Sequence, residues 1–146
     1  MLYLLDTGIL LRFLHGSDPA QPAIRGAIRR LRRRGDDCVT SLQNLCEFWN
    51  VCTRPASARG GMGLDFDQTY RRLRIVERLF DILPDSAEVL GQWRALVLQH
   101  RVHGVQVHDA RLVALMNVHG VTHLLTLNPR DFGRFPHLTV VTPDQI

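Results

Sequence analysis

Four acidic residues lie in segments where carboxylates could act together: Asp6 in LYLLDTG, Glu47 in SLQNLCEFWNVCTRP, Asp109 in VHDARLVALMNVHG and Asp131 in TLNPRDF. Carboxylates that meet in one cleft repel one another, and they stay ionised when a cation neutralises them. Oxygen donors without His or Cys favour Mg²⁺ or Mn²⁺ over zinc. Such an ion can activate a water molecule and hold a phosphodiester, so the chemistry in question is metal-dependent hydrolysis.

Each acid alone also has an ordinary structural explanation. Asp6 and Asp109 stand where helices are predicted to begin, and Asp is a favourable N-cap there. Glu47 belongs to a polar stripe that solvent could accommodate. Asp131 lies in an Asn-Pro turn, where Asp is common. Taken one at a time these explanations stay open, and only convergence of the four side chains would favour a metal site.

The elements that must position these acids follow an alternating pattern. Short apolar runs are separated by one or two longer periodic segments, which predicts parallel strands joined by helical crossovers. We therefore expect a three-layer α/β/α sandwich with a central parallel sheet. The predicted strands are LYLL (2–5), CVT (38–40), FDIL (80–83), THLLTL (122–127) and LTVV (138–141).

Helix boundaries are indicated by capping residues. Asp18 is expected to cap a helix that has Pro19 at its first position and ends at Gly35. Asp65 and Gln68 have the spacing of a capping box. Two later helices are predicted, from Ser86 to about Val102 and from near Asp109 to Gly120.

The helix that carries Glu47 is predicted to be amphipathic. Glu47 falls on its polar side, where Phe48 and Val51 flank the polar stripe and leave it narrow. It is also the only acid between Asp37 and Asp65. The three cysteines have neither disulfide nor zinc spacing, and we expect them to be core residues: Cys38, Cys46 and Cys52. The predicted apolar face consists of Leu42, Leu45, Cys46, Trp49 and Cys52.

These elements bring the acids to one place. Open parallel sheets have their sites at the carboxyl ends of the strands. Asp6 and Asp131 each follow a strand, and the elements that carry Glu47 and Asp109 reach the same edge in the expected fold. The seven histidines match no zinc motif, and we interpret them as surface residues.

Composition limits the class of protein. The 146 residues are 45% hydrophobic, which is typical of a globular chain, and we expect one domain over residues 1–146. No apolar run approaches the roughly 18 residues of a membrane span. The start MLYLLD lacks the basic region of a signal peptide. We therefore expect a cytoplasmic protein that makes no contact with a membrane.

Arginine accounts for all 18 basic residues, and its distribution is uneven. Five arginines fall within RRLRRR (29–34), and removing them would change the net charge from +4 to −1. Such a patch suits phosphate contact, and Arg54 is a further candidate for contact with RNA. A solvated helix face is the open alternative.

In this order, LLDTGILLRFL, NLCEFWNVCTRP, VHDARLVALM and TLNPRDF resemble the motifs of PIN-domain ribonucleases, and more closely those of VapC-type toxins of bacterial toxin–antitoxin pairs. The resemblance spans the whole chain and depends on the ordered set. It implies a PIN-like α/β/α fold, a divalent-metal site and endonucleolytic cleavage of RNA, with tRNA as one candidate substrate. It also implies a small antitoxin protein that blocks the site, and frequent homodimers.

The resemblance implies a role for each matching residue. Asp6 and Asp109 match the principal metal ligands, Glu47 the third acid and Asp131 the fourth, which often acts through water. Thr7 matches the hydroxyl residue beside the first Asp.

Asn128 matches the Asn of the late N-x-x-D motif and is expected to orient the acids. Our hypothesis is that a water molecule activated by Mg²⁺ or Mn²⁺ attacks the RNA phosphorus and leaves 5′-phosphate and 3′-hydroxyl ends.

The alternative is a nucleic-acid- or protein-binding domain on the same fold with negligible catalysis. A phosphatase or receiver domain would usually carry a second Asp where this chain has Gly8.

Overall fold

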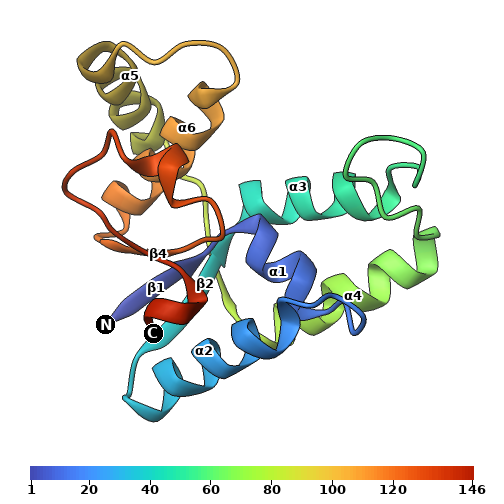
Figure 1. Cartoon of the computed structure of the whole chain (residues 1–146). Coiled ribbons are helices and arrows are strands. Elements are labelled where there is room, and N and C mark those ends of the chain that lie inside the picture. The colour runs from blue at the N-terminus through green and yellow to red at the C-terminus, as the bar shows by residue number, and fades with distance from the viewer.

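A computed structural model describes residues 1–146, and its centre is a five-stranded, fully parallel sheet (Figure 1). The strand order is β3-β2-β1-β4-β5, with β1 in the middle. The expected fold class is confirmed, and all five predicted strands are present. Their bounds are β1 Leu2–Leu5, β2 Asp37–Ser41, β3 Asp81–Leu83, β4 His123–Leu125 and β5 Thr139–Val141.

Six α-helices cover the two faces of this sheet, with α5 and α6 on one side and α1 to α4 on the other (Figure 1). Two short 3₁₀ helices follow β4 and β5. The helix bounds are α1 Thr7–Phe13, α2 Gln21–Arg33, α3 Leu42–Thr53, α4 Phe66–Leu79, α5 Glu88–His100, α6 Gln106–Val118, η1 Pro129–Phe132 and η2 Pro143–Gln145.

Alternation along β1 produces the two cores. Leu4 belongs to a cluster of buried residues shared with α5 and α6, whereas Tyr3 and Leu5 belong to a second cluster shared with the helices of the opposite face. Successive strand residues point to opposite faces. A strand buried on both faces is a continuous apolar run, which is why LYLL carries no polar alternation.

Strand register brings the carboxyl ends together. In the central strands, Leu5 pairs with Leu125, and Leu4 pairs with Val39. Chain segments that leave these strands therefore begin at one edge of the sheet. We call this edge, where α1, α3 and the segment after β4 start, the carboxyl edge.

Two helices begin at positions other than those predicted. Helix α2 starts at Gln21, because the Asp18 carboxylate accepts a hydrogen bond from Ala20 N and closes a turn ahead of the helix. Pro22, in place of Pro19, occupies the first helical turn. Helix α6 starts at Gln106, ahead of the predicted start near Asp109. The capping box of Asp65 and Gln68, in contrast, is confirmed with both of its hydrogen bonds.

The predicted apolar face of α3 was wrong in part. Leu42 is 48% exposed and Cys46 is exposed, whereas Phe48, which was predicted to flank the polar stripe, is fully buried. The helix is rotated because Asn44 is itself buried and donates a hydrogen bond to the Thr7 hydroxyl. This polar anchor turns Leu45 and Phe48 into the core. Of the three cysteines, only Cys38 and Cys52 are core residues.

None of the helices combines the length and apolar character needed to cross a bilayer.

Candidate acidic site at the carboxyl edge

Asp6 lies at the carboxyl end of β1 and also caps α1. Its backbone N–H donates to Leu125 O (3.0 Å), which continues the pairing of β1 with β4. One carboxylate oxygen accepts from Thr7 N (2.8 Å) and the other accepts from Thr126 Oγ1 (2.6 Å). The N-cap explanation is therefore correct as far as it goes, but the second oxygen is held by a different segment of the chain.

The electrostatic surroundings of Asp6 are unfavourable for its charge. Burial raises the pKa of the Asp6 carboxyl, and the nearby charges of Glu47 and Asp131 raise it further. Hydrogen bonds from Thr126 and Thr7 lower the same pKa in part. A solvent-exposed N-cap would not be desolvated in this way, so the capping role alone does not account for the surroundings of Asp6.

Glu47 is held from two sides in the second turn of α3. Its Oε2 accepts from Thr7 Oγ1 (2.7 Å), and its Oε1 accepts from Gln43 Nε2 (3.0 Å). Thr7 Oγ1 accepts in turn from Asn44 Nδ2 (3.1 Å), and the Ser41 hydroxyl donates to Asn44 Oδ1. Glu47 is thus an oriented carboxylate and not a member of a freely solvated stripe.

Asp109 lies in the first turn of α6, and it does not cap this helix. The N-cap is Val105, which makes no side-chain capping hydrogen bond. Burial raises the pKa of the Asp109 carboxyl to about 6, and the charges of Asp131, Asp6 and Glu47 raise it as well, against a lowering by Arg134. The capping explanation of Asp109 therefore does not hold.

Asp131 lies on η1, the 3₁₀ turn that follows β4. Its backbone N–H donates to Asn128 O (3.1 Å) and its side chain is exposed. Its negative charge raises the pKa of both Asp6 and Asp109. The turn at Pro129 thus leaves Asp131 within electrostatic reach of the other acids.

The four carboxylates, here called the acidic site (Asp6, Glu47, Asp109 and Asp131), interact electrostatically without forming a closed cage. No three His, Cys, Asp or Glu side chains lie close enough together to hold a metal ion as they stand. Mutual repulsion of uncompensated carboxylates favours such an open arrangement. The donor set nevertheless fits a hard divalent cation, since it is made of carboxylate oxygens that a cation would relieve of repulsion.

Several hydrogen-bonding partners of the acids were not anticipated from the sequence. Thr126 is fully buried and donates to Asp6, but a Thr at the end of an apolar strand gives no signal of its own. Asn44, in the first turn of α3, donates to Thr7, and Ser41, the N-cap of this helix, donates to Asn44; the sequence gives no signal for either contact. Arg134 is near Asp109 and donates to Gln106 Oε1.

Asn128, which was expected to orient the acids, contributes through its backbone. Its N–H donates to Thr126 Oγ1 (3.1 Å) and its carbonyl accepts from Asp131 N. The side chain of Asn128 is exposed and makes no hydrogen bond. Asn128 thus links the threonine that holds Asp6 to the turn that carries Asp131.

The arginine patch lies away from the acidic site. Helix α2 ends just before β2 begins, so RRLRRR (29–34) is at the amino ends of the strands (Figure 1). Three of its members make internal contacts: Arg30 with Ile146 O, Arg32 with Leu79 O and Arg34 with Asp36. A groove of about 570 Å³ between α2 and α4 is lined by four arginines, Arg25, Arg29, Arg32 and Arg33, and by no acidic residue.

Arg54, the candidate RNA contact, caps the far end of α3. Its guanidinium donates to Arg59 O (2.9 Å) within the loop that follows the helix. It lies seven positions after Glu47, which corresponds to about 10 Å of helix. Contact of Arg54 with RNA remains a prediction.

The sequence also matches a family model. Residues 3–138 match the model of the PIN domain. The chain belongs to the PIN-domain family. No curated protein matches this PIN domain in sequence.

Solved structures with the same fold come from toxin–antitoxin complexes. A chain of VapBC2 from Rickettsia felis, bound to a promoter DNA fragment, is 18% identical with a TM-score of 0.73, over 97% of this chain and 98% of that one. A chain of VapBC-1 from nontypeable Haemophilus influenzae is 18% identical with a TM-score of 0.68, over 99% of both chains.

A third similar structure is that of VapC20 from Mycobacterium tuberculosis, described as a sarcin–ricin loop cleaving toxin. It is 17% identical with a TM-score of 0.58, over 84% of this chain and 86% of that one. At these identities the likeness establishes the fold of the PIN domain and nothing finer.

Proposed function

We propose that this PIN domain is a divalent-metal-dependent endoribonuclease and the toxin of a type II toxin–antitoxin pair. The observation that carries the proposal is that four carboxylates from separate segments lie within electrostatic reach of one another. Burial, and after it the charges of Asp131, Asp6 and Glu47, raises the pKa of Asp109 to about 6. Groups with strongly shifted pKa values at one edge of an α/β sheet mark a functional site. Membership of the PIN-domain family and the similarity to chains of toxin–antitoxin complexes support the choice of RNA as substrate and of an antitoxin as partner.

In this proposal each acid has a defined task. Asp6 and Asp109 are the principal ligands of Mg²⁺ or Mn²⁺, with Glu47 and Asp131 completing the set. When bound, the ion would supply an activated water molecule and neutralise the charge that develops on the phosphate. Thr7 holds Glu47 in place by donating to its Oε2.

The remaining residues keep the acids in position during the reaction. Thr126 donates to Asp6 Oδ2, and the backbone N–H of Thr7 at the N-terminus of α1 donates to Asp6 Oδ1. Both oxygens of this carboxylate are therefore held in place. Arg134 supplies positive charge near Asp109. Preorganised charge of this kind contributes strongly to stabilising a transition state because it need not reorganise during the reaction.

We also propose a homodimer and an antitoxin that covers the acidic site. The competing proposal is a nucleic-acid- or protein-binding domain with negligible catalysis.

Cleavage of end-labelled total tRNA and of a generic single-stranded RNA, with Mg²⁺, Mn²⁺ or EDTA, tests the proposal. Asp6→Asn and Asp109→Asn keep the shape of the side chain while removing its charge. We expect cutting that requires the metal and is lost in both variants. Equal cutting by wild type and variants would indicate a contaminant and refute the proposal, whereas RNA binding without any cutting would favour the binding domain.

A further inference from the structure

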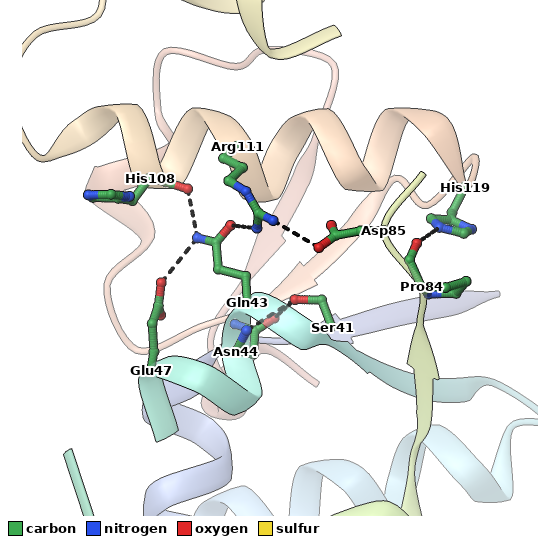
Figure 2. Close-up of polar contacts among 9 residues, drawn as sticks. All are labelled: Ser41, Gln43, Asn44, Glu47, Pro84, Asp85, His108, Arg111 and His119. Atoms are coloured by element: carbon green, nitrogen blue, oxygen red, sulfur yellow. Dashed lines mark hydrogen bonds and ion pairs between the residues drawn. The ribbon is translucent and has the colours of Figure 1, made fainter. Parts of the chain in front are cut away.

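A single amide group connects the elements that carry two of the acids. Gln43, in the first turn of α3, donates from Nε2 to Glu47 Oε1 (3.0 Å) and to His108 O (2.8 Å). His108 is the residue before Asp109 in the first turn of α6. Figure 2 shows the Gln43 side chain between α3 and α6, directed at both partners. The two helices lie on opposite faces of the sheet, so this contact crosses the site.

The orientation of this amide is determined by an arginine. Gln43 Oε1 accepts from Arg111 Nη1 (2.7 Å), and Arg111 Nη2 forms an ion pair with Asp85 Oδ2 (2.9 Å). A guanidinium has donors only, so it can face the amide oxygen and not the amide NH₂. With the oxygen fixed on Arg111, the NH₂ group must face Glu47 and the His108 carbonyl (Figure 2).

Glu47 gains a defined geometry from this arrangement. Thr7 holds one of its oxygens and Gln43 the other, so both carboxylate oxygens accept from groups fixed by different elements. Partners that orient a ligand carboxylate typically affect metal affinity or activity by about 10- to 100-fold. The positive charge of the Arg111 guanidinium is also brought close to Glu47, since only the Gln43 amide lies between them in this chain of hydrogen bonds.

Packing alone gives no reason for this set of contacts. Gln43 is only half-buried, and the Arg111–Asp85 pair is partly exposed to solvent. Exposed ion pairs contribute little to stability. A solvated glutamine at this position would need no fixed amide orientation.

We infer that Gln43 is a positioning residue of the acidic site. It couples Glu47 to the first turn of α6, where Asp109 lies, and it is itself oriented by Arg111. The inference rests on the proposed function, because it assigns Gln43 a role toward the metal that the acids are proposed to hold. Arg111 and Asp85 act through Gln43. Neither of them needs to contact the metal or the RNA.

The test uses the full chain and two independent readouts. Mn²⁺ binding is followed by the loss of the free Mn²⁺ EPR signal in the absence of RNA, and cleavage in Mg²⁺ gives kcat and KM. Gln43→Met keeps the length of the side chain and removes all its hydrogen bonds. Gln99→Met is the matched control, since Gln99 is exposed on α5 and makes no side-chain hydrogen bond.

For Gln43→Met we expect the Kd for Mn²⁺ to rise about 10-fold and kcat to fall about 10- to 100-fold. KM for RNA should change less than kcat, because a positioning role acts on the chemical step. Gln99→Met should match the wild type in both readouts. Asp85→Asn weakens the partly exposed ion pair that holds Arg111, and it should change both readouts in the same direction as Gln43→Met but by less.

Coupling between Gln43 and Arg111 is tested by the double variant. If Arg111 acts through Gln43, Gln43→Met combined with Arg111→Met should lose no more than Gln43→Met alone. Independent, additive losses would overturn the role given to Arg111. Wild-type-like Mn²⁺ binding and kcat in Gln43→Met would overturn the inference while leaving the proposed function intact. A wild-type chain that neither binds Mn²⁺ nor cuts RNA would overturn both.

Discussion

At the scale of residues, the acidic site is a place where the chain tolerates unfavourable charge. The pKa of Asp109 is raised to about 6 and that of Asp6 is raised as well, so both carboxyls bind protons more readily in the folded chain than in the unfolded one. Between about pH 4 and pH 6, folded Asp109 therefore holds a proton that unfolded Asp109 has lost. By linkage, the contribution of Asp109 to the free energy of unfolding falls as pH rises through this window.

The direction of this pH dependence leads to a prediction for the metal-free protein. In EDTA the Tm should be lower at pH 7 than at pH 5, and Asp109→Asn should remove part of this dependence and raise the Tm at pH 7 by a few degrees. Calorimetric scans at both pH values measure the effect. Identical pH dependence in wild type and Asp109→Asn would contradict the burial and charge coupling of Asp109.

Thr126 allows a second prediction at the same scale. Thr126→Val keeps the side-chain shape in a fully buried position but removes the hydrogen bond to Asp6. A hydrogen bond to a charged group contributes about 1.5–3 kcal/mol, so the free energy of unfolding should fall by that order. We also expect kcat for RNA cleavage to fall by about 10-fold or more, because the Asp6 carboxylate is no longer fixed.

Thr40→Val is the matched control for Thr126→Val. Thr40 is equally buried, but its hydroxyl donates to Leu5 O (3.4 Å) within the sheet and makes no hydrogen bond to any of the acids. Urea unfolding and cleavage kinetics should show a stability loss in both variants and a loss of kcat only in Thr126→Val. Unchanged kcat in Thr126→Val would remove Thr126 from the site.

At the scale of elements, the rotation of α3 decides which residues reach the site. Phe48 is fully buried and Leu42 is 48% exposed, the reverse of the predicted face. Phe48→Ala should therefore lower the free energy of unfolding by about 3–5 kcal/mol. Leu42→Ala, on the same helix, should change it by less than about 0.5 kcal/mol. Similar losses in the two variants, measured by urea unfolding, would contradict this rotation of the helix.

The strands and most of the helices could be predicted from the sequence because their signals are local. LYLL is apolar on both faces, and Asp65 with Gln68 forms a capping box within four residues. The rotation of α3 could not be predicted, because it depends on a hydrogen bond between Asn44 and Thr7, which are 37 positions apart. The turn made by Asp18 also competed with the expected helix start.

The acidic site could likewise be predicted only in part, because some of its residues carry local signals and others depend on long-range contacts. Asp6 and Asp131 could be placed because each follows a strand, and the carboxyl ends of parallel strands share one edge. Asp109 was open to an N-cap explanation until the structure showed α6 starting at Gln106. Thr126 and Arg111 could not be predicted, since their roles depend on long-range contacts that no spacing along the chain encodes.

At the scale of the whole molecule, charge is divided between two ends of the sheet. The acidic site lies at the carboxyl edge, and the arginine patch at 29–34 lies beside the amino ends of the strands. If RNA binds at the acidic site, Arg29 and Arg33 should contribute little to its phosphate contacts. A contact with single-stranded nucleic acid adds about 0.7 to the slope of log affinity against log salt.

Arg29→Gln combined with Arg33→Gln should therefore leave the salt dependence of kcat/KM for RNA nearly unchanged. Arg134→Gln, near Asp109, should reduce that slope and weaken RNA binding. Cleavage assays over a series of salt concentrations measure both slopes. A clearly reduced slope in the Arg29 and Arg33 variant alone would show that the RNA path extends over α2, as the sequence first indicated.

The most direct measurement of the central proposal is the chemistry of the product ends. A single defined RNA is cut by the wild-type chain in Mg²⁺, and the fragments are mapped by mass spectrometry beside those from Asp109→Asn and from an EDTA control. Hydrolysis at the acidic site predicts 5′-phosphate and 3′-hydroxyl ends, which should be absent from both controls. Fragments that end in 2′,3′-cyclic phosphate, or cutting that persists in EDTA, would contradict a metal-dependent site built from these four acids.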